Sequence, residues 1–241
     1  MEAWLVQHTD VVKRIRDEDW EIFHQVCPYR PFRKGDTIYY AGDPASSMHI
    51  VAQGQIKLVN MTAGGQERIV AICGKQDFIG EAFLSENAVY RADAIALTEG
   101  ATCPISRPQF LELAKQAPRF VLSIAEVLAG QLFECREQLT DAYAPVKARV
   151  VKVLLSQALR FGQPLEHSLQ QARSESSTQD TSAWYSLDTA LKHEEVAAMV
   201  TATRVSVSMA IAELRDEGLL EGSRGKYRLE LNGLEALLER N

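Results

Sequence analysis

The fold is decided by the stretch Leu191-Lys-His-Glu-Glu-Val-Ala-Ala-Met-Val-Thr-Ala-Thr-Arg-Val-Ser-Val-Ser-Met-Ala-Ile-Ala-Glu-Leu214, which predicts two short helices joined by a tight turn. Apolar residues recur at helical spacing in both halves, so one face of each helix packs on the other. The segment 215–231 follows with Gly218, which favours a helix end, and then with the glycine-punctuated pattern of a small β-hairpin. Together these features predict a winged helix-turn-helix.

The opposite face of the second helix carries mostly small or hydrogen-bonding residues of the kind that contact phosphates and base edges. These candidates are Thr203, Arg204, Val205, Ser206, Ser208 and Met209, joined on the hairpin by Arg224 and Lys226. Arg204 is the candidate for a bidentate contact to guanine O6 and N7, and Val205 for packing on a thymine methyl group. The alternative for Val205 and Met209 is that they pack on neighbouring protein. Double-stranded DNA is the predicted partner.

The charge balance is unusual for a DNA-binding chain, because the formal net charge is −6. Residues 184–241 contain seven Lys and Arg against ten Asp and Glu. DNA binding must therefore depend on local clustering of cations on the second helix and the hairpin. The cations concerned are Arg204, Arg215, Arg224, Lys226 and Arg228. An effector-binding module with a degenerate DNA-binding domain stays the alternative.

The rest of the chain predicts an α+β protein with three parts. Short alternating segments separated by glycine turns run from about 29 to 106 and predict a small β-barrel or jelly roll. We expect a barrel domain over 1–117 with a helical lead-in, a long helix over 118–144 ended by Pro145, and the winged domain over 145–241. The polar stretch 162–183 is predicted to be a loop.

The long helix has a repeat of seven residues that favours dimerisation. One seam position recurs at Ala125, Leu132 and Leu139, and the other at Leu128, Cys135 and Ala142. The alternative is a single amphipathic helix that lies on its own barrel. A dimer would place Cys135 near its mate, which raises the hypothesis of a redox switch beside the simpler interpretation of a small core residue.

Other classes of protein are disfavoured by the sequence. No apolar run approaches the ~20 residues that span a bilayer, and no signal peptide is recognisable, so we expect a cytoplasmic protein without membrane contact. The four cysteines form no Cys-x-x-Cys pair, which argues against a zinc site and against a disulfide framework. No nucleophile, phosphate-loop or metal-hydrolase motif is present, so an enzyme is not expected.

Three segments, taken in order, resemble the family of the cyclic-AMP receptor protein and FNR, bacterial transcription regulators. The first is the set of glycine turns from Arg33-Lys-Gly-Asp-Thr-Ile38 through Gly42 to Gly54, and the second is the run Asp77-Phe-Ile-Gly-Glu81 ten residues before Arg91. The third is Leu191-Lys-His-Glu-Glu-Val-Ala197, followed by Ala202-Thr-Arg-Val-Ser-Val-Ser208 and Glu217-Gly-Leu-Leu220. The resemblance implies a cyclic-nucleotide-binding-type barrel, a homodimer on a palindromic DNA site and RNA polymerase as a partner. Val205 and Met209 replace two base-reading residues of the family, so the target sequence is expected to differ.

The resemblance also implies an effector site in the barrel, where Gly80 and Glu81 open a short helix, Glu81 holds a ribose and Arg91 holds a cyclic phosphate. A guanidinium is a bidentate phosphate clamp, and a carboxylate accepts from hydroxyls. The remaining matching positions are Ala92, Glu134 and Cys135, and all three depart from the Ser, Thr and Ser of the cyclic-AMP receptor. Cyclic AMP is one candidate effector; another small molecule, or none, is the alternative. The alternative for Glu81 and Arg91 is a mutual salt bridge.

Overall fold

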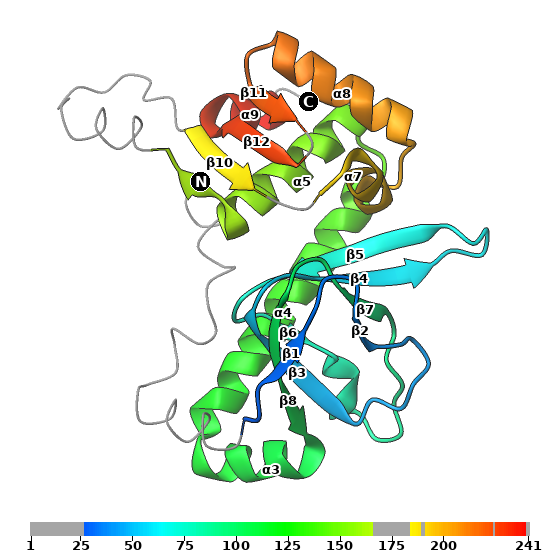
Figure 1. The fold of residues 1–241 in the computed structure, drawn as a ribbon, viewed down its shortest axis with the longest axis vertical. Coiled ribbons are helices and arrows are strands. Elements are labelled where there is room, and N and C mark those ends of the chain that lie inside the picture. The colour runs from blue at the N-terminus through cyan, green and yellow to red at the C-terminus, as the bar shows by residue number, and fades with distance from the viewer. Residues whose placement is uncertain (1–26, 166–183, 189–190, 224, 240–241) are drawn as a thin grey trace, which may run out of the picture. The chain divides into compact units, whose positions relative to one another are not determined.

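The structure is a computed structural model that describes residues 27–165, 184–188, 191–223 and 225–239 (Figure 1). It comprises two compact units, an N-terminal unit of residues 1–136 and a C-terminal unit of residues 137–241. The predicted helical lead-in and most of the predicted polar loop lie outside the described residues.

The N-terminal unit contains two four-stranded antiparallel sheets, which confirm the predicted barrel or jelly roll. One sheet has the order β1-β8-β3-β6 and the other β2-β7-β4-β5. The strands are β1 (Arg30–Phe32), β2 (Thr37–Tyr39), β3 (Ser47–Gln53), β4 (Ile56–Met61), β5 (Glu67–Cys73), β6 (Phe78–Ile79), β7 (Asp93–Ala96) and β8 (Gly100–Ser106). In Figure 1 the β4–β5 hairpin extends from the edge of its sheet.

Alternation of side chains along the strands divides the core of this unit in two. One set fills the space between the sheets and contains the rings of Tyr39 and Tyr90. The other set lies between strands β3 and β8 and the helices that follow them. Met48 and Ile105 enter this second cluster from the strands, whereas Val51 belongs to the first.

Among the residues that the structure describes, the helices that begin in the N-terminal unit are the 3-10 helix η3 (Glu81–Leu84), α3 (Arg107–Gln116) and α4 (Pro118–Asp141). The first turns of α4 pack on the second core cluster through Phe120 and Ile124, and Leu128 is packed against the same cluster. Further along α4, Leu132 and Leu139 are 52% and 71% exposed. The helix therefore packs on its own unit through its first turns, whereas Leu132 and Leu139 are exposed.

A disulfide between Cys27 and Cys103 corrects the expectation that the cysteines form no disulfide. Their Cα atoms lie 5.5 Å apart, inside the usual range for such a bond, although 76 residues separate them in the sequence. The antiparallel pairing of β1 with β8 brings these two parts of the chain together. Sequence spacing does not reveal such a contact, because it arises only from strand order.

The part of the C-terminal unit that the structure describes contains helices and a four-stranded sheet of order β11-β12-β10-β9. The elements are α5 (Val146–Phe161), β9 (Gln163–Pro164), β10 (Trp184–Asp188), α7 (His193–Val200), α8 (Arg204–Asp216), β11 (Leu220–Ser223), β12 (Lys226–Glu230) and α9 (Leu231–Glu239). Helix α5 contacts α7, α8 and α9. The helix-turn-helix and its β-hairpin are confirmed, whereas β9 falls at the start of the predicted loop.

Within the described ranges no single helix is long and apolar enough to cross a membrane. Helices α7 and α8 reach the required apolar length only as a pair that is bent by 105°. Their apolar residues, such as Val196, Val207 and Ile211, are fully buried in the C-terminal unit.

Candidate nucleic-acid interface and effector site

Helix α8 begins at a well-defined cap. The Thr203 hydroxyl accepts a hydrogen bond from the Ser206 backbone N–H at 3.1 Å, and the two hydroxyl oxygens lie 2.9 Å apart. A threonine in this position satisfies one of the free N–H groups of the first turn. The two side chains thus serve the helix itself, while Thr203 remains exposed at the surface.

The turn before α8 depends on an unusual backbone. Thr201 ends α7 with a φ of 52°, in the left-handed region that favours glycine. For a β-branched residue this conformation is strained. The sharp reversal nevertheless sets α8 against α7, and the Ala202 N–H donates to the Ala197 carbonyl at 3.1 Å.

Two cations of α5 hold α7 and α8 in place. The Lys147 ammonium lies 3.3 Å from a Glu213 carboxylate oxygen and 2.5 Å from one of Glu217, and the hydrogen bond to Glu217 is the main cause of its raised pKa. The Arg149 guanidinium donates to the Val200 carbonyl at the end of α7. The reading helix is therefore attached to α5 through two of its carboxylates and through the end of α7, and precise base contacts require such supporting contacts.

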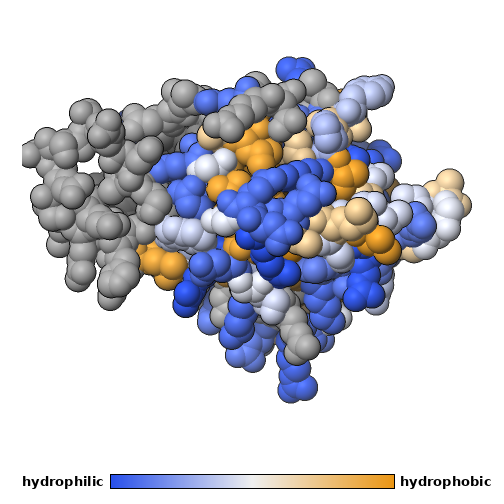
Figure 2. All heavy atoms as spheres, turned by 90° about the horizontal axis from the view of Figure 1, so that it is seen from above, coloured by the Kyte–Doolittle hydropathy of each residue, from blue (hydrophilic) through white to orange (hydrophobic). Residues whose placement is uncertain are grey.

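The outer face of α8 exposes the residues that the sequence singled out. Val205 is 68% exposed and Met209 is 60% exposed, so neither packs on the described protein around it. The Arg204 side chain is 67% exposed, and its Nε lies 3.1 Å from the Glu194 carboxylate. Helix α8 lies at the top of Figure 1, and the view from above in Figure 2 shows apolar side chains among hydrophilic ones.

Ser208 has a partner that sequence reasoning missed. Its hydroxyl lies 2.8 Å from Nδ1 of His193, at the start of α7, and both side chains are half-buried. Burial, and then the charges of Arg215 and Arg204, lower the pKa of His193. The polar run Lys192-His-Glu-Glu195 could have indicated this contact, because the residues at the start of α7 lie beside α8 in a helix-turn-helix.

The wing is attached to α8 by one arginine. Arg215 donates to the Gly222 carbonyl on β11 at 2.6 Å, and Arg228 on β12 lies 3.7 Å from the Glu221 carboxylate. These two cations, which the sequence offered as part of a basic cluster, thus have partners within the protein. Lys226 is exposed at the start of β12. Arg224 lies outside the described residues.

In the N-terminal unit, Gly80 occupies a position that no other residue fits without strain. Its φ is 80°, and a Cβ there would meet Cε1 of Tyr90 at 3.0 Å and the Ser47 carbonyl oxygen at 3.2 Å. Gly80 is the residue before η3, a single turn of four residues whose dipole is correspondingly small. Glu81 opens that turn and is exposed, as is Arg91.

A pair of buried tyrosines lies against Gly80. The rings of Tyr39 and Tyr90 are stacked with centroids 3.8 Å apart, and the Tyr90 hydroxyl donates to the Ser47 carbonyl at 2.7 Å. Burial and then the Glu81 carboxylate raise the pKa of Tyr39. The predicted effector-site residues of the barrel, Gly80, Glu81, Arg91 and Ala92, are called the cassette below. Through Gly80 the cassette borders a packed aromatic core.

Nearby lies a buried polar cluster that the sequence did not indicate. The two ring nitrogens of His49 lie 3.2 Å from the Ser47 hydroxyl and 3.4 Å from the Thr102 hydroxyl. Burial, followed by the charge of Arg30, lowers the pKa of His49 to about 4. His49 is therefore neutral at physiological pH and acts as a hydrogen-bonding core residue.

Glu81 and Arg91 form no ion pair among the described residues, so the alternative of a mutual salt bridge has no support. Asp93, which introduces a negative charge near Arg91, accepts a hydrogen bond from the Ala41 backbone N–H at 2.7 Å. Ala92 is half-buried, and Cys135 is exposed as a free thiol on α4. The Glu134 side chain lies outside what the structure describes.

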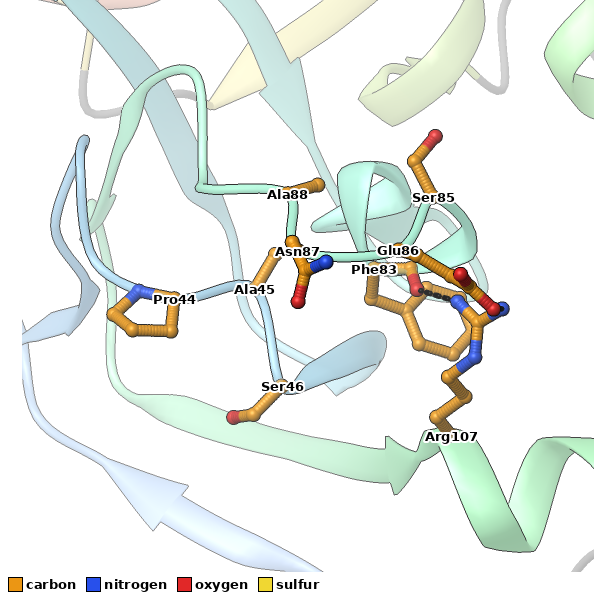
Figure 3. A pocket seen from close by; sticks show the side chains of 9 residues that line it. All are labelled: Pro44, Ala45, Ser46, Phe83, Ser85, Glu86, Asn87, Ala88 and Arg107. Carbon is orange, nitrogen blue, oxygen red and sulfur yellow. Dashed lines mark hydrogen bonds and ion pairs between the residues drawn. The ribbon is translucent and has the colours of Figure 1, made fainter.

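A pocket of about 320 Å³ lies beside the cassette but is not the predicted effector site (Figure 3). Its lining consists of Pro44, Ala45, Ser46, Phe83, Ser85, Glu86, Asn87, Ala88 and Arg107. Arg107 donates to the carbonyls of Phe83 and Leu84 and lies 3.6 Å from the Glu86 carboxylate. Since its guanidinium already has these partners, the pocket offers no free cation to an anionic ligand.

Comparison with known families assigns both units. Residues 29–117 match the cyclic nucleotide-binding domain, and residues 148–240 match the Crp-like helix-turn-helix domain. These two matches cover the barrel with α3 and nearly all of α5 to α9.

Individual relatives agree with the domain matches. The chain is 29% identical over 208 residues to the transcriptional regulator LdrP of Thermus thermophilus, covering 85% of this chain and 93% of the relative. It is 26% identical over 192 residues to the cyclic AMP receptor protein of the same organism, covering 79% and 78%. The structure of a CooA mutant from Carboxydothermus hydrogenoformans shares the fold, with a TM-score of 0.72, 17% identity and coverage of 95% and 96%. The chain thus belongs to the cyclic-AMP receptor protein/FNR family and is a DNA-binding transcription regulator.

Proposed function

We propose that this regulator is a cytoplasmic, non-enzymatic homodimer that reads a palindromic DNA site with the N-terminal half of α8. The observation that carries the proposal is the exposure of Arg204, Val205 and Met209 on a helix that α5 holds rigidly. Arg204 contacts guanine O6 and N7, and Val205 packs on a thymine methyl group. The half-sites of the palindrome lie about one helical turn apart, ~34 Å.

Phosphate contacts in this proposal come from residues around the reading helix. Thr203, Ser206 and Lys226 fix the register of α8 without reading sequence. Ser208 contributes through the His193 pair, and Arg224 remains a prediction from the sequence. RNA polymerase is the further macromolecular partner that we propose for the bound dimer.

Dimerisation is proposed to use the distal half of α4. Leu132 and Leu139 repeat at seven residues, are exposed, and share their seam with the exposed Ala125. Leu128, which lies in the other predicted seam, is packed on the protein's own core and contributes less. A Leu132→Lys variant is expected to sediment as a monomer, whereas Leu111→Lys, an equally exposed site on α3, is the matched control that remains dimeric.

For the barrel we propose a small effector held by Gly80, Glu81, Arg91 and Ala92, with Glu134 and Cys135 from α4. Cyclic AMP is the first ligand to test. The stacked tyrosines beneath Gly80 favour a second candidate, a constitutive regulator that binds DNA without an effector. An effector changes DNA binding only if it binds the DNA-competent state more tightly than the other state.

The test is selection of bound sequences from random double-stranded DNA by the ligand-free protein, followed by the same selection with cyclic AMP. A two-fold palindrome in both selections supports the constitutive regulator, and one that requires cyclic AMP supports the nucleotide sensor. Absence of enrichment under both conditions would refute cyclic AMP and constitutive binding together.

A further inference from the structure

The ion pair between Glu194 and Arg204 connects the beginnings of the two helices of the helix-turn-helix. Glu194 is the second residue of α7 and Arg204 the first of α8, and the Arg204 Nε lies 3.1 Å from a Glu194 carboxylate oxygen. Both side chains are more than half exposed, so the pair lies on the surface that carries Val205 and Met209.

Glu194 is not required to cap its own helix. That role belongs to Glu195, whose carboxylate accepts a hydrogen bond from the Lys192 backbone N–H at 2.8 Å and closes a capping box. Two successive glutamates thus begin α7, and they have different partners. Only Glu194 is directed to the reading helix.

The contact with Glu194 uses the Nε edge of the Arg204 guanidinium and leaves its terminal nitrogens available to a base. Arginine carries five N–H donors in a planar fork, and a guanine is recognised by two donors in that plane. With the carboxylate at Nε, the two terminal nitrogens of Arg204 have no other partner among the residues that the structure describes. An arginine side chain is otherwise free to rotate, and ordering it opposes binding.

Glu194 helps Arg204 to recognise guanine, but its negative charge weakens binding to unrelated DNA. A carboxylate at the DNA-facing surface repels phosphates, and phosphate attraction supplies nearly all sequence-independent affinity. His193 precedes Glu194, its ring lies 2.8 Å from the Ser208 hydroxyl, and the charges of Arg215, Arg204 and Glu194 act on it. The Glu194 carboxylate is more than half exposed and therefore adds a negative charge to this surface.

We propose that Glu194 is a positioning residue that holds the Arg204 guanidinium for guanine recognition, and that it raises sequence discrimination while it weakens binding to unrelated DNA. The inference rests on the proposed function, in which Arg204 contacts guanine. It accounts for an acidic residue on a DNA-reading surface whose unit has more acidic than basic residues.

The test measures dissociation constants of the full chain for its selected DNA site, for the site with the Arg204-contacted guanine replaced by adenine, and for unrelated DNA. Glu194→Ala is expected to lose about fivefold of the guanine-over-adenine discrimination, the size of a good exposed ion pair, and to bind unrelated DNA at least as tightly as the wild type. In an Arg204→Ala background the same change is expected to have no effect on discrimination. Glu235→Ala, an exposed carboxylate on α9, is the control for loss of one negative charge.

Glu194→Gln separates positioning from simple repulsion, since its amide oxygen still accepts from the Arg204 Nε–H. It is expected to discriminate better than Glu194→Ala, and a Gln variant no better than the Ala variant would overturn the proposal. Unchanged or increased discrimination in Glu194→Ala would also overturn it, because the carboxylate would then be irrelevant or would compete with the base. If Arg204→Ala itself leaves discrimination intact, the guanine assignment fails, and the role of Glu194 fails with it.

Discussion

The two sites that the sequence predicts differ in what surrounds them. On α8, Val205 and Met209 extend into solvent, and the arginine beside them has a single surface partner. At the barrel cassette, Gly80 is buried against stacked tyrosines, while Glu81 and Arg91 lie exposed above it. A DNA-reading surface must be open before its partner arrives, whereas a ligand site must contain space.

This difference shows that DNA reading depends on the local sequence pattern, whereas effector binding depends on how the barrel is packed. The reading surface needs only a helix with the right residues on one face, and periodicity specifies that directly. The effector site depends on which side chains fill the barrel, and the cassette motif does not specify them. We therefore expect changes in the barrel to act mainly on stability and changes on α8 to act mainly on recognition.

The largest effect is expected at Tyr90. Tyr90→Ala removes a buried aromatic ring and is expected to lower the free energy of unfolding by about 3–5 kcal/mol in urea denaturation. Tyr90→Phe keeps the ring but loses the hydroxyl, which donates to the Ser47 carbonyl and accepts from the Ser47 backbone N–H, so it should cost about 1–2 kcal/mol. A Tyr90→Ala protein as stable as the wild type would show that the cassette does not border a filled core.

His49 is expected to make the N-terminal unit sensitive to acid. Its pKa is about 4 when folded against 6.5 for an ordinary histidine, so the unfolded chain binds more protons between these values. Its contribution to stability is therefore complete above pH 6.5 and is lost as the pH falls to about 4, a total of about 3 kcal/mol. Urea denaturation across this range, compared with His49→Gln, isolates the effect, and an equal acid loss in both proteins would refute it.

A comparison of Arg204 with Lys226 tests which residues of the C-terminal unit read the DNA sequence and which contact phosphates. Arg204→Ala is expected to remove about 1–3 kcal/mol of discrimination for the specific site, because it removes a bidentate base contact. Lys226→Ala should weaken specific and unrelated DNA about equally, because a phosphate contact carries no sequence information. Competition binding with both DNAs measures the two effects. Equal losses of discrimination in the two variants would contradict the separation of base contact from phosphate contact.

The smallest effect is expected at the turn before α8. Thr201→Gly removes the strain of a threonine in the left-handed region, because glycine adopts that conformation without strain. Glycine also loses more conformational entropy on folding, so the net stabilisation of the C-terminal unit is expected to be only about 0.5–1 kcal/mol. Ala202→Gly is the control, because Ala202 does not share the positive φ. Thermal unfolding distinguishes them, and a destabilised Thr201→Gly protein would show that the turn is not strained.

The sequence predicted the parts of the fold that repeat or alternate. Val196, Val207 and Ile211 recur at helical spacing, and the structure buries all three. Strands β1 and β6 were not predicted, and with three and two residues they show little alternation. The equally short β2 was predicted because Thr37-Ile-Tyr consists of β-branched and aromatic residues. Strand β10 was missed although Trp184 and Tyr185 favour a strand, because no turn signal separates it from the polar stretch before it.

The site residues were predictable as candidates, but their partners were not. Arg204 follows from its place on the second helix, whereas its pairing with Glu194 depends on the angle between two helices. The same holds for the contact of Ser208 with His193 and for the disulfide between Cys27 and Cys103. Tertiary contacts of this kind join residues whose separation in sequence carries no signal.

The most direct test of the account is the salt dependence of DNA binding by an acidic protein whose reading helix is exposed. The measurement is the dissociation constant for the selected double-stranded site over a series of salt concentrations. We predict an affinity that falls linearly with salt on logarithmic axes, because Lys226 and the predicted contact Arg224 of each subunit displace counterions from phosphates. An affinity that does not change with salt, or absence of binding at low salt, would contradict the claim that this face reads DNA.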